Sequence, residues 1–191
     1  MRVGRVLYPI KALGPGERLG IWVQGCERRC DGCANPELQA MDGKEMPLPV
    51  LIAMCRAAIE DYHLTGITIS GGEPMLQAEE LAELLRSLRP LCDDILLFTG
   101  YMPAELKRDE RRGAIEAVLA NVDVLVDGVY IKERNRGEIL RGSDNQVIHF
   151  LSDGVREKYE AYINANKNTV DEFLAPDGVV AVGIHPGEII K

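Results

Sequence analysis

Residues 66–74 read Gly66-Ile67-Thr68-Ile69-Ser70-Gly71-Gly72-Glu73-Pro74, and a stretch with leucines at helical spacing follows at about 78–88. The β-branched run at the start of this segment is typical of a short strand, and the glycines and proline mark a turn into a helix. Strand, turn and helix together form one βα unit. The unit predicts an α/β fold with a parallel sheet and helices outside it.

The same alternation continues on both sides of this unit, and residues 3–23 resemble a hairpin. The ligand site of such a sheet is expected beyond the carboxyl ends of its strands. The pattern leaves an open sheet and a partial barrel as alternatives. His185, next to the last strand, is expected to have a role in a turn. Further strands are expected at 3–10, 19–23, 94–98, 122–126, 146–151 and 178–184. Further helical regions are expected at 50–62, at 103–121 with an interruption near 111–113, and at 155–173.

Size and composition favour a single domain. The chain has 191 residues, of which 46% are hydrophobic, and no apolar run approaches the roughly 20 residues that span a bilayer. Its N-terminus does not resemble an export signal. The net charge of −8 argues against general nucleic-acid binding. An odd number of cysteines, three of them clustered, favours a reducing cytoplasm over a disulfide framework.

The clustered cysteines lie in the loop Gly25-Cys26-Glu27-Arg28-Arg29-Cys30-Asp31-Gly32-Cys33, with the spacing C-x3-C-x2-C. Thiolates are soft ligands for zinc, copper(I) or iron–sulfur clusters, and closed zinc and 4Fe-4S sites take four protein ligands. Three thiolates therefore leave one metal corner open. A zinc knuckle and an electron-carrying ferredoxin are the alternatives, but both require a fourth ligand. Cys55 and Cys92 are instead expected to pack in the core.

The cysteine loop and the Gly-Gly-Glu-Pro turn together resemble the radical S-adenosylmethionine superfamily. Further motifs are similar to the activating enzymes of anaerobic ribonucleotide reductase. They lie at 14–18, 99–101, 123–128 and 141–148. The resemblance covers residues 1–151 and implies a partial parallel (βα) barrel. We therefore predict one radical S-adenosylmethionine domain over 1–191, with an activase-like core at 1–151 and a C-terminal helix and strand at 152–191.

The resemblance also implies the cofactors and their ligands. Cys26, Cys30 and Cys33 would hold one 4Fe-4S cluster, and S-adenosylmethionine would bind its open iron. The turn residues would hold the methionine end of that cofactor, and three polar residues near strand ends are weaker candidates for contacts with it. The turn residues are Gly71, Gly72, Glu73 and Pro74, and the polar residues are Thr99, Asp127 and Asn145.

The implied reaction is reductive cleavage of S-adenosylmethionine to methionine and a 5'-deoxyadenosyl radical, which abstracts a hydrogen atom from a glycine of a partner glycyl radical enzyme. The electron would come from a flavodoxin- or ferredoxin-type donor. A radical enzyme that modifies a peptide or small molecule is one alternative, and an iron–sulfur electron-transfer protein is another. The chain departs from the family at Ala34, where an aromatic residue is usual, and beyond Leu151, where compact activators end.

Overall fold

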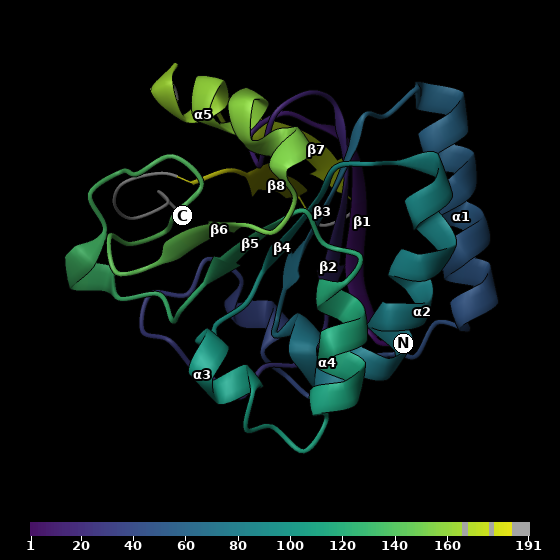
Figure 1. The fold of residues 1–191 in the computed structure, drawn as a ribbon, viewed down its shortest axis with the longest axis horizontal. Helices are drawn as coiled ribbons and strands as arrows, with labels where there is room; N and C mark the ends of the chain where they lie inside the picture. Colours follow the sequence, from purple (N-terminus) through teal and green to yellow (C-terminus); the bar gives the residue numbers. More distant parts are fainter. Residues whose placement is uncertain (166–167, 176–177, 185–191) are drawn as a thin grey trace.

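The computed structural model describes residues 1–165, 168–175 and 178–184 and is built on one six-stranded sheet with the order β1-β2-β3-β4-β5-β6 (Figure 1). Strands β2 to β5 are parallel, whereas β1 and β6 pair antiparallel at the two edges. The prediction of an α/β fold with a sheet rich in parallel pairs is therefore confirmed. The strands are β1 (Val3–Ile10), β2 (Arg18–Val23), β3 (Gly66–Gly71), β4 (Ile95–Phe98), β5 (Val124–Asp127) and β6 (Val147–Phe150).

The helices that follow the parallel strands cover one face of the sheet, and α1, α2 and α4 lie together there in Figure 1. Cys55 and Cys92 are buried in the described structure, as expected. Within the described residues, no helix is both long and apolar enough to cross a bilayer. The α-helices are α1 (Leu48–Tyr62), α2 (Ala78–Leu88), α3 (Pro103–Leu106), α4 (Arg112–Leu119) and α5 (Arg156–Asn164), and the 3-10 helices are η1 (Pro36–Leu38), η2 (Pro74–Gln77), η3 (Arg89–Leu91), η4 (Lys132–Arg134) and η5 (Asp153–Val155).

The two faces of the sheet carry different side chains because successive residues of a strand point to opposite sides. In β2, Ile21 packs in the large core beneath the helices, whereas Trp22 belongs to a separate cluster on the other face. Tyr159 of α5 packs on this second face against Leu96 and Val124. The second face is therefore covered partly by elements from the C-terminal part of the chain.

The prediction of a helix over 155–173 is wrong in its second half. Helix α5 ends at Asn164, and β7 (Asp171–Ala175) pairs antiparallel with β8 (Gly178–Val182) in a separate two-stranded sheet. Burial alternates along β7, which is the period of a strand. The Asp171 carboxylate accepts hydrogen bonds from the backbone N–H groups of Lys11 and Ala12 at 2.6 and 2.8 Å. These contacts hold β7 against the loop after β1. His185 lies outside the described residues.

A buried ion pair joins α5 to the amino-terminal edge of the parallel strands. The guanidinium of Arg18, at the start of β2, donates to the two carboxylate oxygens of Asp94 at 2.8 and 3.2 Å and to Thr68 Oγ1 at 2.7 Å. From α5, Tyr159 donates its hydroxyl to Asp94 at 2.8 Å, and Lys158 Nζ lies 2.8 Å from the same carboxylate. Burial alone would raise the pKa of Asp94, but the Arg18 charge and these hydrogen bonds hold it below its usual value.

Replacing Arg18 by Met is expected to lower the free energy of unfolding by about 3–5 kcal/mol, because it leaves the Asp94 charge buried without its main partner. Arg112→Met is the matched control, since the Arg112 side chain is 63% exposed, and it should change stability by no more than about 0.5 kcal/mol. Urea denaturation measures both. The pKa of Asp94 is depressed in the folded state, so its contribution is lost as pH falls through that folded pKa. The wild type and Arg18→Met should therefore converge in acid. Equal effects of the two substitutions would contradict this account.

Candidate functional site

A cavity of about 1270 Å³ opens at the carboxyl ends of the parallel strands. Its wall combines the cysteine loop after β2, the glycine turn after β3, the turn after β4, and residues of β8. Seven of the ten residues predicted for the site line this cavity, and Pro74, Asp127 and Asn145 are not among the lining residues. The seven are Cys26, Cys30, Cys33, Gly71, Gly72, Glu73 and Thr99.

The cysteine loop and the glycine turn are joined through their backbones. Gly72 N–H donates to Val23 O at 2.8 Å, and Glu73 N–H donates to Gly25 O at the same distance. A Cβ atom on Gly72 would lie 2.2 Å from Gly25 O, far inside any normal contact. Gly71 has a φ of +112°, and a Cβ there would lie 2.4 Å from Val23 N. Glycine is thus required at both positions for the turn to approach the loop.

Glu73 links the glycine turn to the turn after β4. Its buried carboxylate accepts hydrogen bonds from Thr99 Oγ1 at 2.8 Å, from Gly100 N–H at 2.7 Å and from Met75 N–H at 3.0 Å. Burial raises the pKa of Glu73, while the three donors and the charge of Arg28 oppose that rise. Both carboxylate oxygens thus accept hydrogen bonds from the protein, Oε1 from Met75 and Thr99 and Oε2 from Gly100. Glu73 therefore ties the glycine turn to the turn after β4.

The three thiols are presented by one short loop. Cys26 is buried, whereas Cys30 and Cys33 are partly exposed. Backbone N–H groups of Arg28 and Asn35 donate to the sulfurs of Cys26 and Cys33, each at 3.4 Å. In the described part of the chain, no group of three or more His, Cys, Asp or Glu side chains is already arranged to hold a single metal ion.

This donor set fits an iron–sulfur cluster. Three soft thiol ligands line one cavity, and backbone donors to sulfur are typical of cluster sites. The two remaining cysteines, Cys55 and Cys92, are buried and do not line the cavity. The chain thus offers three thiols, and no fourth cysteine, to a cluster bound here.

Sequence reasoning did not find a contact between the cysteine loop and the turn after β4. The guanidinium of Arg28 lies over the ring of Tyr101, 3.8 Å from its centroid, and its Nη2 lies 2.8 Å from Glu105 Oε1. Arg28 and Glu105 are 77 positions apart, so no local pattern reveals the pair. The basic residue within the loop and the aromatic residue after Thr99 and Gly100 were the only sequence signals available.

Comparison with known proteins assigns this architecture to a family. A family model described as a 4Fe-4S single cluster domain matches residues 12–149. The chain is 36% identical over 150 residues to the anaerobic ribonucleoside-triphosphate reductase-activating protein of Vibrio cholerae, covering 74% of this chain and 94% of the relative. The chain belongs to the radical S-adenosylmethionine activating-enzyme family. The protein of the same name from Escherichia coli K12 is 34% identical over 155 residues, covering 75% of this chain and 96% of the relative.

The similarity extends to a second kind of activating enzyme. The pyruvate formate-lyase-activating enzyme of Streptococcus mutans is 30% identical over 155 residues, covering 73% of this chain and 56% of that protein. The cofactors of this radical S-adenosylmethionine family are a 4Fe-4S cluster and S-adenosylmethionine. The cysteine loop and the glycine turn both fall within the range matched by the family model.

Two of the predicted polar residues make contacts within the protein. Asp127 is buried, with its Oδ2 2.9 Å from His149 Nε2 and its Oδ1 3.2 Å from the N–H of Val147. The side-chain amide of Asn145 donates to Val129 O at 2.8 Å. Both side chains thus connect the loop and strand that follow β5. Their contact with a cofactor stays a prediction, as does that of the buried Pro74.

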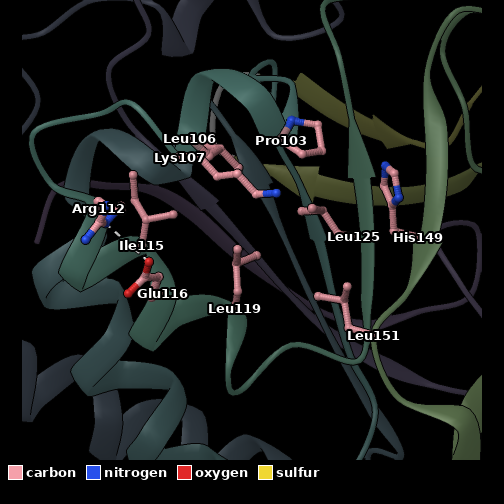
Figure 2. A pocket seen from close by; sticks show the side chains of 10 residues that line it. All are labelled: Pro103, Leu106, Lys107, Arg112, Ile115, Glu116, Leu119, Leu125, His149 and Leu151. Carbon is pink, nitrogen blue, oxygen red and sulfur yellow. Dashed lines mark ion pairs between the residues drawn. The ribbon is translucent and has the colours of Figure 1, made fainter.

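His149 faces a second, smaller cavity of about 260 Å³ (Figure 2). This cavity lies between helices α3 and α4 and the β5–β6 edge of the sheet. Leu106 and Ile115 line it from the helices, and Leu125 and Leu151 line it from the strand side (Figure 2). The cavity is mainly apolar and separate from the cysteine loop. His149 is thus not part of the wall that carries the three thiols.

Residues near the C-terminus of the described structure contribute to the large cavity. Residues 181–184, in and just after β8, line it together with Trp22 of β2. Val182 is buried in a cluster with Ile10, Leu13 and Trp22. The family match ends at residue 149, so this part of the wall lies outside the matched region.

Proposed function

We propose that this protein is an activating enzyme that installs a glycyl radical on a partner enzyme of the anaerobic ribonucleotide reductase type. The observation that carries the proposal is the single cavity lined by three thiols and a glycine turn joined to them. Relatives named as activating proteins of that reductase match almost their whole length to this chain, which supports this partner class. The relative named as a pyruvate formate-lyase-activating enzyme makes that lyase type the second candidate partner.

The roles of the residues follow from their positions. Cys26, Cys30 and Cys33 would hold the cluster, and Gly71 and Gly72 would let the backbone approach the methionine end of S-adenosylmethionine. When bound, the two cofactors supply a one-electron cleavage and the abstraction of a hydrogen atom. The protein supplies binding, orientation and exclusion of water. A single electron from a flavodoxin- or ferredoxin-type donor completes the balance.

The other predicted contacts have unequal support. Thr99 lines the cavity, but its hydroxyl donates to Glu73, so it would act mainly by holding that carboxylate in place. Asp127 and the amide nitrogen of Asn145 are engaged with neighbouring protein groups, and neither residue lines the cavity, although Asn145 Oδ1 is buried without a partner among the described residues. We therefore consider Asp127 and Asn145 weaker candidates for contact with S-adenosylmethionine than the residues of the glycine turn.

We further propose that residues 1–191 form one radical S-adenosylmethionine domain, with the core at 1–151 and the extension at 152–191. The six-stranded sheet would be a partial barrel whose inner face is the one that carries Trp22 and Phe98, both of which line the cavity. The extension would cover the cofactors, because residues 181–184 line the same cavity. The five free cysteines are consistent with work in the reducing cytoplasm.

The test uses the full chain, loaded with iron and sulfide under anaerobic conditions and reduced with dithionite. It should cleave S-adenosylmethionine to methionine and 5'-deoxyadenosine, measured by chromatography. Mixed with an anaerobic ribonucleotide reductase, it should then produce the doublet EPR signal of a glycyl radical on that partner. A partner in which the radical glycine is replaced by alanine is the control and should give no doublet.

Three results would count against the proposal in different ways. Cleavage with no radical on either type of glycyl radical enzyme would favour modification of a peptide or small molecule. A radical only on a pyruvate formate-lyase would change the partner class. A reduced cluster that does not cleave S-adenosylmethionine would indicate an electron carrier.

A further inference from the structure

Arg28 is the part of the cysteine loop that reaches across the cavity wall to another strand end. Its guanidinium stacks on Tyr101 at 3.8 Å and pairs with Glu105 at 2.8 Å. A Cβ atom on Gly100 would lie 2.9 Å from Arg28 Cγ, so the aliphatic stem also lies close against this turn. Arg28 thus contacts the turn after β4 with both its stem and its charged end.

Glu105, the partner of Arg28 in this ion pair, is itself held in place. Glu105 accepts a hydrogen bond from the N–H of Met102 at 2.7 Å at the start of α3. Gly100, beneath the Arg28 stem, donates to Glu73 in the glycine turn at 2.7 Å. Through these contacts, Arg28 connects the cysteine loop to the turn after β4, which is in turn hydrogen-bonded to the glycine turn. A long side chain that makes both a stacking contact and an ion pair holds a loop more firmly than either contact alone.

The charge of Arg28 lies in a place where it can affect a cluster. The residue lines the cavity and stands midway between Cys26 and Cys30 in the chain. Its side chain is only 21% exposed, so solvent screens its charge less than that of a surface residue. Its Nε is buried and has no hydrogen-bond partner within the described structure. Charge and hydrogen bonds near the sulfurs set the reduction potential of such clusters.

We propose that Arg28 is a positioning residue, which fixes the middle of the cysteine loop on the Thr99–Tyr101 turn and raises the reduction potential of the bound cluster. This inference rests on the proposed function, since it needs a cluster on the three cysteines. The added electron makes the cluster more negative, so a nearby cation stabilises the reduced form. Glu105 opposes that effect, because its carboxylate neutralises part of the same charge.

The experiment compares the wild type with Arg28→Gln, Arg28→Lys and Glu105→Gln after cluster loading, and measures iron and sulfide content first and the midpoint potential second. Arg28→Gln should lower the potential by up to about 59 mV, equivalent to a tenfold change in the ratio of reduced to oxidised cluster. Arg28→Lys should keep most of the wild-type potential. Glu105→Gln should raise the potential, by less, because the Glu105 side chain is 39% exposed.

Arg29→Gln is the matched control. Arg29 is the next residue of the same loop and is exposed, and within the described residues its side chain reaches only Gln39, at 3.5 Å. The Arg29→Gln substitution removes the same charge at nearly the same place in the chain. Because water screens the charge of Arg29, the reduction potential should change much less than in Arg28→Gln.

A second readout needs no cluster. In the metal-free protein, labelling of Cys30 and Cys33 by a thiol reagent should be several-fold faster in Arg28→Gln than in the wild type. Arg28→Lys should give an intermediate rate, because it keeps the ion pair but loses the planar stack.

Opposite shifts of potential in Arg28→Gln and Glu105→Gln, together with faster labelling in Arg28→Gln, would support the inference. Shifts of the same sign in both variants would indicate loop damage alone and overturn it, as would equal shifts in Arg28→Gln and Arg29→Gln or unchanged labelling. A wild type that takes up no cluster is a failure of the proposed function instead. In that case the labelling rates still decide whether Arg28 fixes the loop.

Discussion

Replacing Cys30 by Ala is expected to abolish both cluster uptake and cleavage of S-adenosylmethionine. Cys30 is the middle thiol of the loop and lines the cavity with Cys26 and Cys33. With it removed, the loop offers two thiols where the resemblance requires three, and no other cysteine lines the cavity. Iron and sulfide analysis after anaerobic loading measures the first effect, and chromatography of 5'-deoxyadenosine measures the second.

Cys55→Ala is the matched control for this experiment. Cys55 is fully buried in α1, and burial raises the pKa of its thiol to about 12, so it does not supply a thiolate ligand. The substitution should cost about 0.5–3 kcal/mol of stability and leave cluster content and cleavage unchanged. Loss of the cluster in Cys55→Ala, or its retention in Cys30→Ala, would overturn the assignment of ligands.

Replacing Gly72 by Ala is expected to have the second largest effect, because the new methyl group would meet Gly25 O at 2.2 Å. The contact is with backbone of the cysteine loop, so a side-chain rotation cannot relieve it. The glycine turn and the cysteine loop must therefore separate. This separation breaks the hydrogen bonds that Gly72 and Glu73 donate to Val23 O and Gly25 O. A displacement of about 1 Å at a reacting site can cost about 100-fold in rate. We therefore expect cleavage of S-adenosylmethionine to fall at least that far.

Gly113→Ala is the control for Gly72→Ala. Gly113 lies in α4, and a Cβ atom there would meet nothing within 4 Å. Alanine favours the helix, so this variant should be as stable as the wild type or more stable by up to about 1 kcal/mol, with unchanged cleavage. Circular dichroism and the cleavage assay on both variants separate a local effect at the joint from a general loss of folding. Full activity in Gly72→Ala would show that the joint does not position the cofactor.

The features that sequence reasoning found are those whose chemistry is local. The three cysteines lie within eight residues and the glycine turn directly follows its strand, so both motifs could be read from the sequence, and the family resemblance supplied their roles. The carboxyl ends of parallel strands meet at one edge of the sheet. This rule predicted that the cysteine loop and the glycine turn lie together.

The features that it missed depend on contacts distant in the chain. Arg18 pairs with Asp94 across 76 positions and Arg28 with Glu105 across 77, and no periodicity marks such pairs. The position of Asp127 at a strand end predicted that it lies at the ligand-binding edge of the sheet. It did not predict the direction of its side chain, which turns to His149. The predicted helix ran on to residue 173, and the alternating burial along β7 became visible only in the structure.

The central claim is that the chain ligates three irons of a four-iron cube and leaves the fourth iron to S-adenosylmethionine. The most direct test is to load the wild type with 57Fe and sulfide and to record Mössbauer spectra with and without S-adenosylmethionine. The account predicts about four irons per chain, as in one 4Fe-4S cluster, with the signal of a single iron changed by the cofactor. A lone zinc ion, or a cluster whose spectrum is unchanged by S-adenosylmethionine, would contradict this claim.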